Sequence, residues 1–148
     1  MANYNDYQHN SRRGGTERQG QSAEVSYGHI LCRFDSKWIT KAIDAEGVKF
    51  CDDVAYELRE VSSSYVRNIF GEIKRIETKG FDNCRTDFFL LRPKVAYSTA
   101  RNDKSKIANL FKEVYNKMAD SVNDNVTFIN LVRMTEAIIA YHRTYTNK

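Results

Sequence analysis

The chain has 148 residues, of which 41% are hydrophobic and 28% are charged, and its formal net charge is +4. This composition is typical of a one-domain globular protein and excludes disordered and membrane-protein compositions. No apolar run approaches the roughly 20 residues of a membrane helix, and the N-terminus lacks the apolar core of a signal peptide. We therefore expect a cytoplasmic protein with no membrane partner.

The first 27 residues are rich in Asn, Gln, Ser, Gly and Arg and contain almost no aliphatic side chains. Such a segment cannot bury enough apolar surface to offset the entropy lost on ordering. We expect residues 1–27 to form a flexible polar tail and residues 28–148 to form a single helical-bundle domain.

Helical spacing begins near Asp35. Asp35 or Ser36 can cap a helix that runs through Ile43, and Gly47 is expected to break or bend it. A second apolar stripe then follows at helical spacing, formed by Phe50, Val54, Ala55 and Leu58. These positions predict helix on both sides of Gly47.

The next helix has a start and a stop signal. The hydroxyls of Ser62, Ser63 and Ser64 can cap its first turn, and Lys79-Gly80 marks its end. Its inward stripe is formed by Val66, Ile69, Phe70, Ile73 and Ile76.

The third long element contains the only proline of the chain, Pro93. Its inward positions are Phe88, Leu91, Val95 and Ser98. Because proline lacks an N–H and clashes with the preceding turn, Pro93 either kinks this helix or begins a new one.

Two further helices complete the chain. One is expected from Lys104 to about Val122, with inward residues Ile107, Leu110, Phe111, Val114 and Met118; the last runs from about Asp124 to Tyr145, with inward residues Phe128, Leu131, Val132, Ile138 and Ile139. No segment alternates apolar and polar residues as a strand does. The sequence predicts an all-α fold, a compact bundle of about five helices joined by short loops.

No catalytic constellation is visible. His9, His29 and His142 are not paired with Cys, Asp or Glu at ligand spacing, and no glycine-rich phosphate loop is present. The cysteines at 32, 51 and 84 form no CxxC pair and are expected to be reduced thiols. His142 is interpreted as a residue near a helix C-terminus that interacts with the helix dipole, and Asp52-Asp53 as a solvated face. We expect no enzyme activity, no cofactor and no metal.

The positive charge is concentrated in the middle of the chain. Residues 59–106 contain eleven Lys or Arg and six Asp or Glu, an excess of +5. Arg67 and Lys74 project together from the helix face opposite its apolar stripe, with Gly71 between them. A glycine there costs about 1 kcal/mol relative to alanine. It can give the backbone of a protein or a nucleic acid room to approach, or it can serve a helix–helix contact within the chain.

The stretch LRPKVAYSTARN (91–102) holds the other basic candidates, Arg92, Lys94 and Arg101. Lys94 and Arg101 are seven residues apart, about 10 Å along one face of a helix. They are placed to meet two phosphates of one strand without reading its sequence. Tyr97 lies between them and is either a ring on which a base stacks or a half-buried ring with a hydrated hydroxyl.

Three segments together carry a family resemblance: SSSYVRNIFGEIKRI (62–76), LRPKVAYSTARN (91–102) and FINLVRMTEAIIAYHR (128–143). Over roughly residues 35 to 145 the chain resembles the small subunit of type III-A CRISPR effector complexes, the Csm family, although SSSYVR departs from the T-S-x-I-R form of that family. The resemblance implies a non-catalytic helical protein in an antiviral ribonucleoprotein. Its implied partners are crRNA and target RNA, the backbone and large subunits, and further copies of itself.

The expected RNA-binding residues are therefore Arg67, Lys74, Arg92, Lys94, Tyr97 and Arg101. A helical adaptor whose basic face meets an acidic protein is the alternative. Tyr141 and Tyr145 are candidates for contacts between copies, or they simply cap the bundle.

Overall fold

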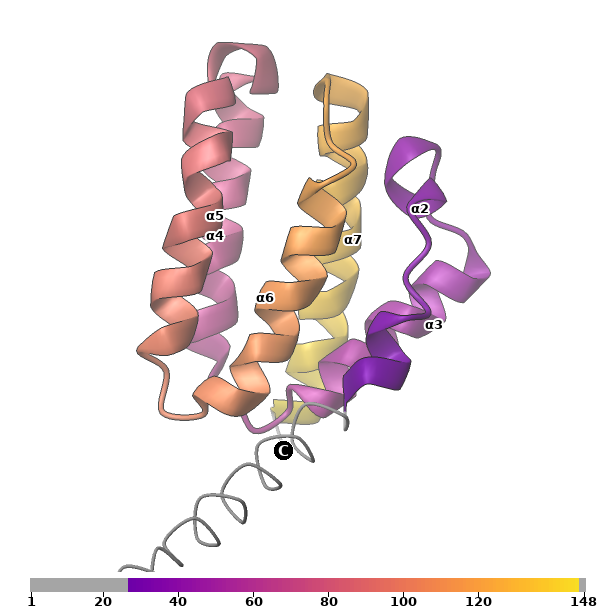
Figure 1. The fold of residues 1–148 in the computed structure, drawn as a ribbon, viewed down its shortest axis with the longest axis vertical. Coiled ribbons are helices and arrows are strands. Elements are labelled where there is room, and N and C mark those ends of the chain that lie inside the picture. Colours follow the sequence, from indigo (N-terminus) through magenta and orange to yellow (C-terminus); the bar gives the residue numbers. More distant parts are fainter. Residues whose placement is uncertain (1–26, 147–148) are drawn as a thin grey trace, which may run out of the picture.

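The computed structural model describes residues 27–146, which contain five long helices (Figure 1). The helices are α2 (Lys37–Thr40), α3 (Ala45–Glu57), α4 (Ser63–Lys79), α5 (Arg85–Ala100), α6 (Ser105–Ala119) and α7 (Asn125–Thr146), with a short 3-10 helix, η2 (Phe81–Asn83), before α5. Residues 27–146 contain no strand, so the predicted all-α fold is confirmed. The predicted tail lies outside the described residues except for Tyr27, which is helical and packs against the core.

The five long helices form a closed ring. Around this ring α3 contacts α7, α7 contacts α4, α4 contacts α5, α5 contacts α6, and α6 contacts α3. α4, α5, α6 and α7 stand side by side, and α3 crosses the lower part of the bundle at an angle (Figure 1). The apolar stripes of all five helices meet in one cluster, whose largest fully buried side chains include Phe50, Phe81, Phe111, Tyr115 and Phe128. The core thus lies inside the ring of helices, and the outer faces carry the charged residues.

The start of the bundle differs from the prediction. The helix expected from Asp35 to Ile43 is only the single turn of α2, and Gly47 neither breaks nor bends a helix but lies in the first turn of α3. The Asp44 carboxylate accepts the Gly47 N–H at 2.9 Å, so a new helix begins here. A Cβ at position 47 would lie 2.6 Å from Ile43 Cγ1 and 3.1 Å from the Trp38 ring. Glycine is present because Trp38 packs directly on the α3 backbone.

The predicted start and stop signals of α4 are confirmed. Ser62 Oγ accepts the N–H of Tyr65 at 3.3 Å, which caps the first turn. Gly80 ends the helix with φ +93°, a left-handed conformation that side chains disfavour.

α5 continues as one helix through Pro93, so no new helix begins there. Pro93 is exposed, which leaves the carbonyl that has lost its helical N–H partner on the solvent side. Ser98, expected to point inward, is also exposed, and the buried residue of this turn is Thr99. The Thr99 hydroxyl bonds Val95 O and the Tyr65 hydroxyl, so its polar group is satisfied within the core.

Candidate nucleic-acid interface

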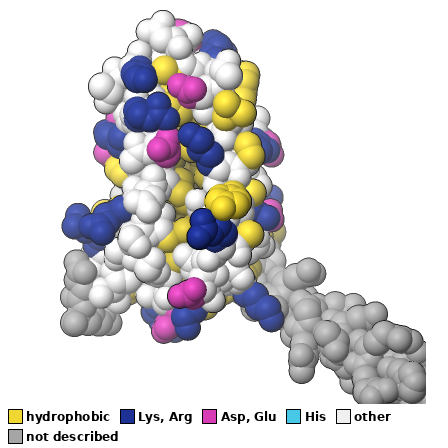
Figure 2. All heavy atoms as spheres, turned by 90° about the vertical axis from the view of Figure 1, so that its left-hand side faces the viewer, with side chains coloured by type: hydrophobic (Ala, Val, Ile, Leu, Met, Phe, Trp, Pro, Cys, Tyr) yellow, Lys and Arg dark blue, Asp and Glu magenta, His cyan; other side chains and the backbone are white. Residues whose placement is uncertain are grey.

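The predicted RNA-binding residues lie on α4 and α5, which run antiparallel. Tyr65 near the start of α4 contacts Thr99 near the end of α5, and Arg75 Nη1 of α4 lies 3.9 Å from Asp87 Oδ2 at the start of α5. The outer faces of the two helices therefore form one surface, which we call the α4–α5 face. Figure 2 shows basic side chains scattered over this side of the molecule among apolar and acidic ones.

On α4, Arg67 and Lys74 project from the outer face as predicted. Arg67 is exposed and forms no ion pair with any residue of 27–146. Lys74 Nζ lies 2.5 Å from Glu77 Oε1 and 3.8 Å from Glu136 Oε2 of α7. The hydrogen bond to Glu77 raises the pKa of Lys74, so this ammonium stays charged but is partly neutralised by its neighbours.

Gly71 lies between these two cations on exposed backbone. A Cβ built at Gly71 meets no atom within 4 Å. The helix–helix contact that was the alternative explanation for this glycine is therefore absent among the described residues. Glycine lowers helix stability by about 1 kcal/mol relative to alanine. No close packing contact within residues 27–146 explains why it is present at position 71.

On α5, Arg92 and Lys94 point toward different neighbouring helices. Arg92 Nη2 lies 2.8 Å from Asp120 Oδ1 at the end of α6, and Lys94 Nζ lies 3.6 Å from Glu72 Oε1 of α4. A hydrogen bond from Arg75, with a further contribution from Lys94, lowers the pKa of Glu72. Both cations are about half exposed, and each already has an acidic partner.

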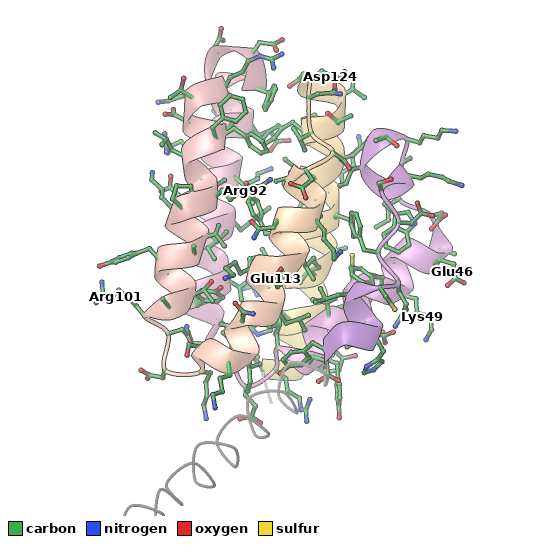
Figure 3. The ribbon with its side chains drawn as sticks, in the orientation of Figure 1. Glu46, Lys49, Arg92, Arg101, Glu113 and Asp124 are labelled. Atoms are coloured by element: carbon green, nitrogen blue, oxygen red, sulfur yellow. The ribbon has the colours of Figure 1, made fainter. Side chains whose placement is uncertain are left out.

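Tyr97 and Arg101 form a pair at the end of α5. Arg101 Nη1 donates to the Tyr97 hydroxyl at 3.2 Å, and the guanidinium carbon lies 5.4 Å from the centre of the Tyr97 ring. The Tyr97 side chain is 63% exposed, so the alternative of a half-buried ring is wrong. Arg101 forms no ion pair among the described residues and points away from the bundle (Figure 3).

The five predicted cations thus fall into two groups, and Tyr97, the sixth residue, pairs with Arg101. Arg67 and Arg101 have no acidic partner in residues 27–146, whereas Lys74, Arg92 and Lys94 do. The prediction did not include Arg75, which bridges Glu72 and Asp87 and so joins the two helices. Helical spacing alone does not reveal such cross-helix pairs, because they depend on the register of one helix against the other.

The residues 27–146 contain no cluster of three or more His, Cys, Asp or Glu that can hold a metal ion. Burial raises the pKa of Cys51 to about 12, so this thiol is protonated and unreactive at neutral pH. Asp52 and Asp53 are not simply solvated: Asp52 accepts the Tyr145 hydroxyl, and Asp53 pairs with Arg33 at 2.8 Å. No helix in the described part of the chain is both long and apolar enough to cross a bilayer.

Comparison with known proteins gives one result. The family model described as Csm2 Type III-A matches residues 44–148, which include every helix from α3 to α7. No curated protein and no solved structure matches the chain. The match covers more than half of the chain and includes all three segments that carry the resemblance seen in the sequence. The chain therefore belongs to the Csm2 family and is a small subunit of a type III-A CRISPR effector complex.

Proposed function

We propose that this small subunit is non-catalytic, lines the channel that holds guide and target RNA, and binds the RNA backbone without sequence preference. It acts in the cytoplasm in antiviral defence, beside the backbone and large subunits and further copies of itself. The binding residues are Arg67, Lys74, Arg92, Lys94, Tyr97 and Arg101.

The observation that carries the proposal is the pair of open cations, Arg67 and Arg101. An exposed cation without an acidic partner can neutralise a phosphate at no cost in broken ion pairs, and it releases a counterion when it does so. Lys74, Arg92 and Lys94 contribute less because a phosphate must compete with Glu77, Asp120 and Glu72.

Gly71 supports the same interface. Open exposed backbone beside Arg67 lets a sugar–phosphate chain approach more closely than a side chain would allow. Phosphate contacts fix position but carry no sequence information, so binding by these groups is equal for all sequences.

The alternative is a helical adaptor whose basic face, including Arg67 and Arg101, meets an acidic protein surface. An adaptor of this kind would bind an acidic protein and would show little affinity for free RNA.

The test compares two double variants that remove the same charge from different sides of the molecule. Arg67→Ala with Arg101→Ala removes the open cations, and Lys37→Ala with Lys41→Ala removes exposed cations at α2. We expect the first pair to weaken binding to several unrelated single-stranded RNAs by the same factor, and the second pair to have a much smaller effect. Equal effects of the two pairs would show that only net charge matters and would overturn the assignment of this face.

A further inference from the structure

A groove with a volume of about 610 Å³ lies between α5, α6 and the helical residues 27–31. We call it the α6 groove, because α6 supplies most of its lining. Ala96 and Ala100 line it from α5, and Tyr27 and Leu31 line it from the other side. Figure 1 shows α6 between α5 and the indigo segment that begins the described chain. Clefts of roughly 300–1,000 Å³ are typical of small-molecule sites in proteins.

The polar side chains of the α6 groove are available to a ligand. Asn109, Lys112 and Glu113 line the groove and are only partly exposed. None of the three forms a side-chain hydrogen bond or an ion pair with another residue of 27–146. Lys106 also lines the groove, is exposed and has no acidic partner among the same residues. A ligand can therefore bind these groups without breaking an existing interaction.

These polar groups exclude a purely apolar occupant. A hydrophobic helix in the groove would cover Asn109, Lys112 and Glu113 and leave them buried without partners. The groove instead fits a flat group with apolar faces and polar edges, which describes a nucleobase. The Tyr27 ring offers a surface for such a face. The Asn109 amide can donate and accept, Glu113 accepts and Lys112 donates, so the edge of the base finds partners.

The start of α6 supplies the cation for a phosphate. Lys106 lies in the first turn of α6, and no side chain caps this turn. An anion beside Lys106 is also favoured by the backbone N–H groups of the turn. Asn109 and Glu113 follow Lys106 at spacings of three and four residues, so all three lie along one side of α6. A phosphate at Lys106 therefore leaves the attached base beside Asn109 and Glu113.

We propose that the α6 groove binds a single nucleotide, with its base against Tyr27 and its phosphate at Lys106. The ligand is a free mononucleotide or an unpaired nucleotide of a bound RNA, and only in the second case does the proposal rest on the proposed function. The site shares no residue with the six proposed to bind the RNA backbone. Tyr27 and Leu31 lie outside residues 44–148, so one wall of the groove lies outside the family match.

The experiment uses three variants of the full chain. Ala96→Leu with Ala100→Leu fills the groove, and both positions are exposed and helical, so we expect this variant to fold. Ser98→Leu is the matched control, because Ser98 is exposed on the same helix and does not line the groove. Lys106→Ala removes the cation proposed to meet the phosphate.

Titration with adenosine monophosphate, followed by the amide NMR signals of the protein, tests the free nucleotide. We expect shifts in all three segments that line the groove and about tenfold weaker binding in the groove-filled variant, with the control unchanged. Lys106→Ala should weaken binding of adenosine monophosphate but not of adenosine. Inorganic phosphate alone should not reproduce the shifts around Tyr27.

The RNA arm compares one single-stranded RNA with an oligonucleotide of the same length and charge that lacks bases. We expect the wild type and the control to prefer the intact RNA, and groove filling to reduce this preference about tenfold. The salt dependence should be the same in all three proteins, because groove filling removes no phosphate contact.

An effect of groove filling on adenosine monophosphate alone assigns the site to a free nucleotide, and an effect on the base preference alone assigns it to RNA. No effect on either would overturn the proposal. So would altered amide signals of residues 1–26 on groove filling without ligand, because the chain's own N-terminal segment would then be the occupant. RNA binding with a normal salt dependence but no groove effect would leave the proposed function intact, and nucleotide binding without any RNA affinity would refute only the proposed function.

Discussion

His142 is buried within the bundle, where its side chain is 1% exposed. Its Nε2 atom lies 3.0 Å from Leu58 O and 3.1 Å from Val61 O, and both carbonyls belong to the α3–α4 connection. Two carbonyl oxygens can only accept, so Nε2 carries the proton and donates to both. His142 therefore holds this connection against α7, and its interpretation as a residue that interacts with the helix dipole is wrong.

We predict that His142→Leu lowers the free energy of unfolding by roughly 1–3 kcal/mol, because two buried carbonyl oxygens lose their donor. Urea denaturation measures the change. Arg143→Leu, at the exposed neighbouring position, is the control and should change stability by less than about 0.5 kcal/mol. A smaller effect at position 142 than at 143 would contradict the role of the imidazole.

Two glycines in helices should respond oppositely to the same substitution. Gly71→Ala adds a methyl group in open space, so we predict a gain of about 0.5–1 kcal/mol from helix propensity. Gly47→Ala places a methyl group against Ile43 and the buried Trp38 ring, so we predict a loss. Thermal unfolding of the two variants measures both effects, and changes of the same sign would count against the packing at Gly47.

At the scale of the helices, the sequence predicted α4, α6 and α7 closely. Their stripes are long and periodic, and Ser62, Gly80 and Asp124 provide local signals at their ends. The helix before Gly47 was predicted too long, because the packing of Trp38 on α3 is a tertiary contact without a local pattern. Only part of the candidate interface could be predicted from the sequence, again because tertiary contacts leave no local pattern. The cations follow from helical spacing, but their acidic partners depend on how the helices pack.

The start of α7 has a pH-sensitive cap. Asp124 Oδ1 accepts the N–H of Thr127 at 2.9 Å, and this bond lowers the pKa of Asp124 from 3.8. A lowered pKa in the folded state means that the carboxylate stabilises the fold above its ordinary pKa and that this contribution is lost as the pH falls through the folded value. We predict that wild type loses more stability than Asp124→Asn between about pH 5 and pH 2. Chemical denaturation at several pH values measures the difference, and parallel curves would contradict it.

At the scale of the whole molecule, net charge is distributed unevenly along the chain. Residues 59–106 carry an excess of +5, and residues 44–60, which include α3, contain six acidic and two basic residues, a net charge of −4. Tyr141 and Tyr145, the sequence-based candidates for contacts between copies, are half-buried and pack against the core instead.

The most direct test of RNA-backbone binding is the salt dependence of affinity for one single-stranded RNA. Each neutralised phosphate contributes about 0.7 to the magnitude of the slope of log affinity against log salt concentration. We predict that Arg67→Ala with Arg101→Ala flattens this slope by about 1.4, while the helical circular-dichroism signal stays the same. An unchanged slope in a correctly folded double variant would contradict RNA binding at the α4–α5 face, because it would show that neither arginine meets a phosphate.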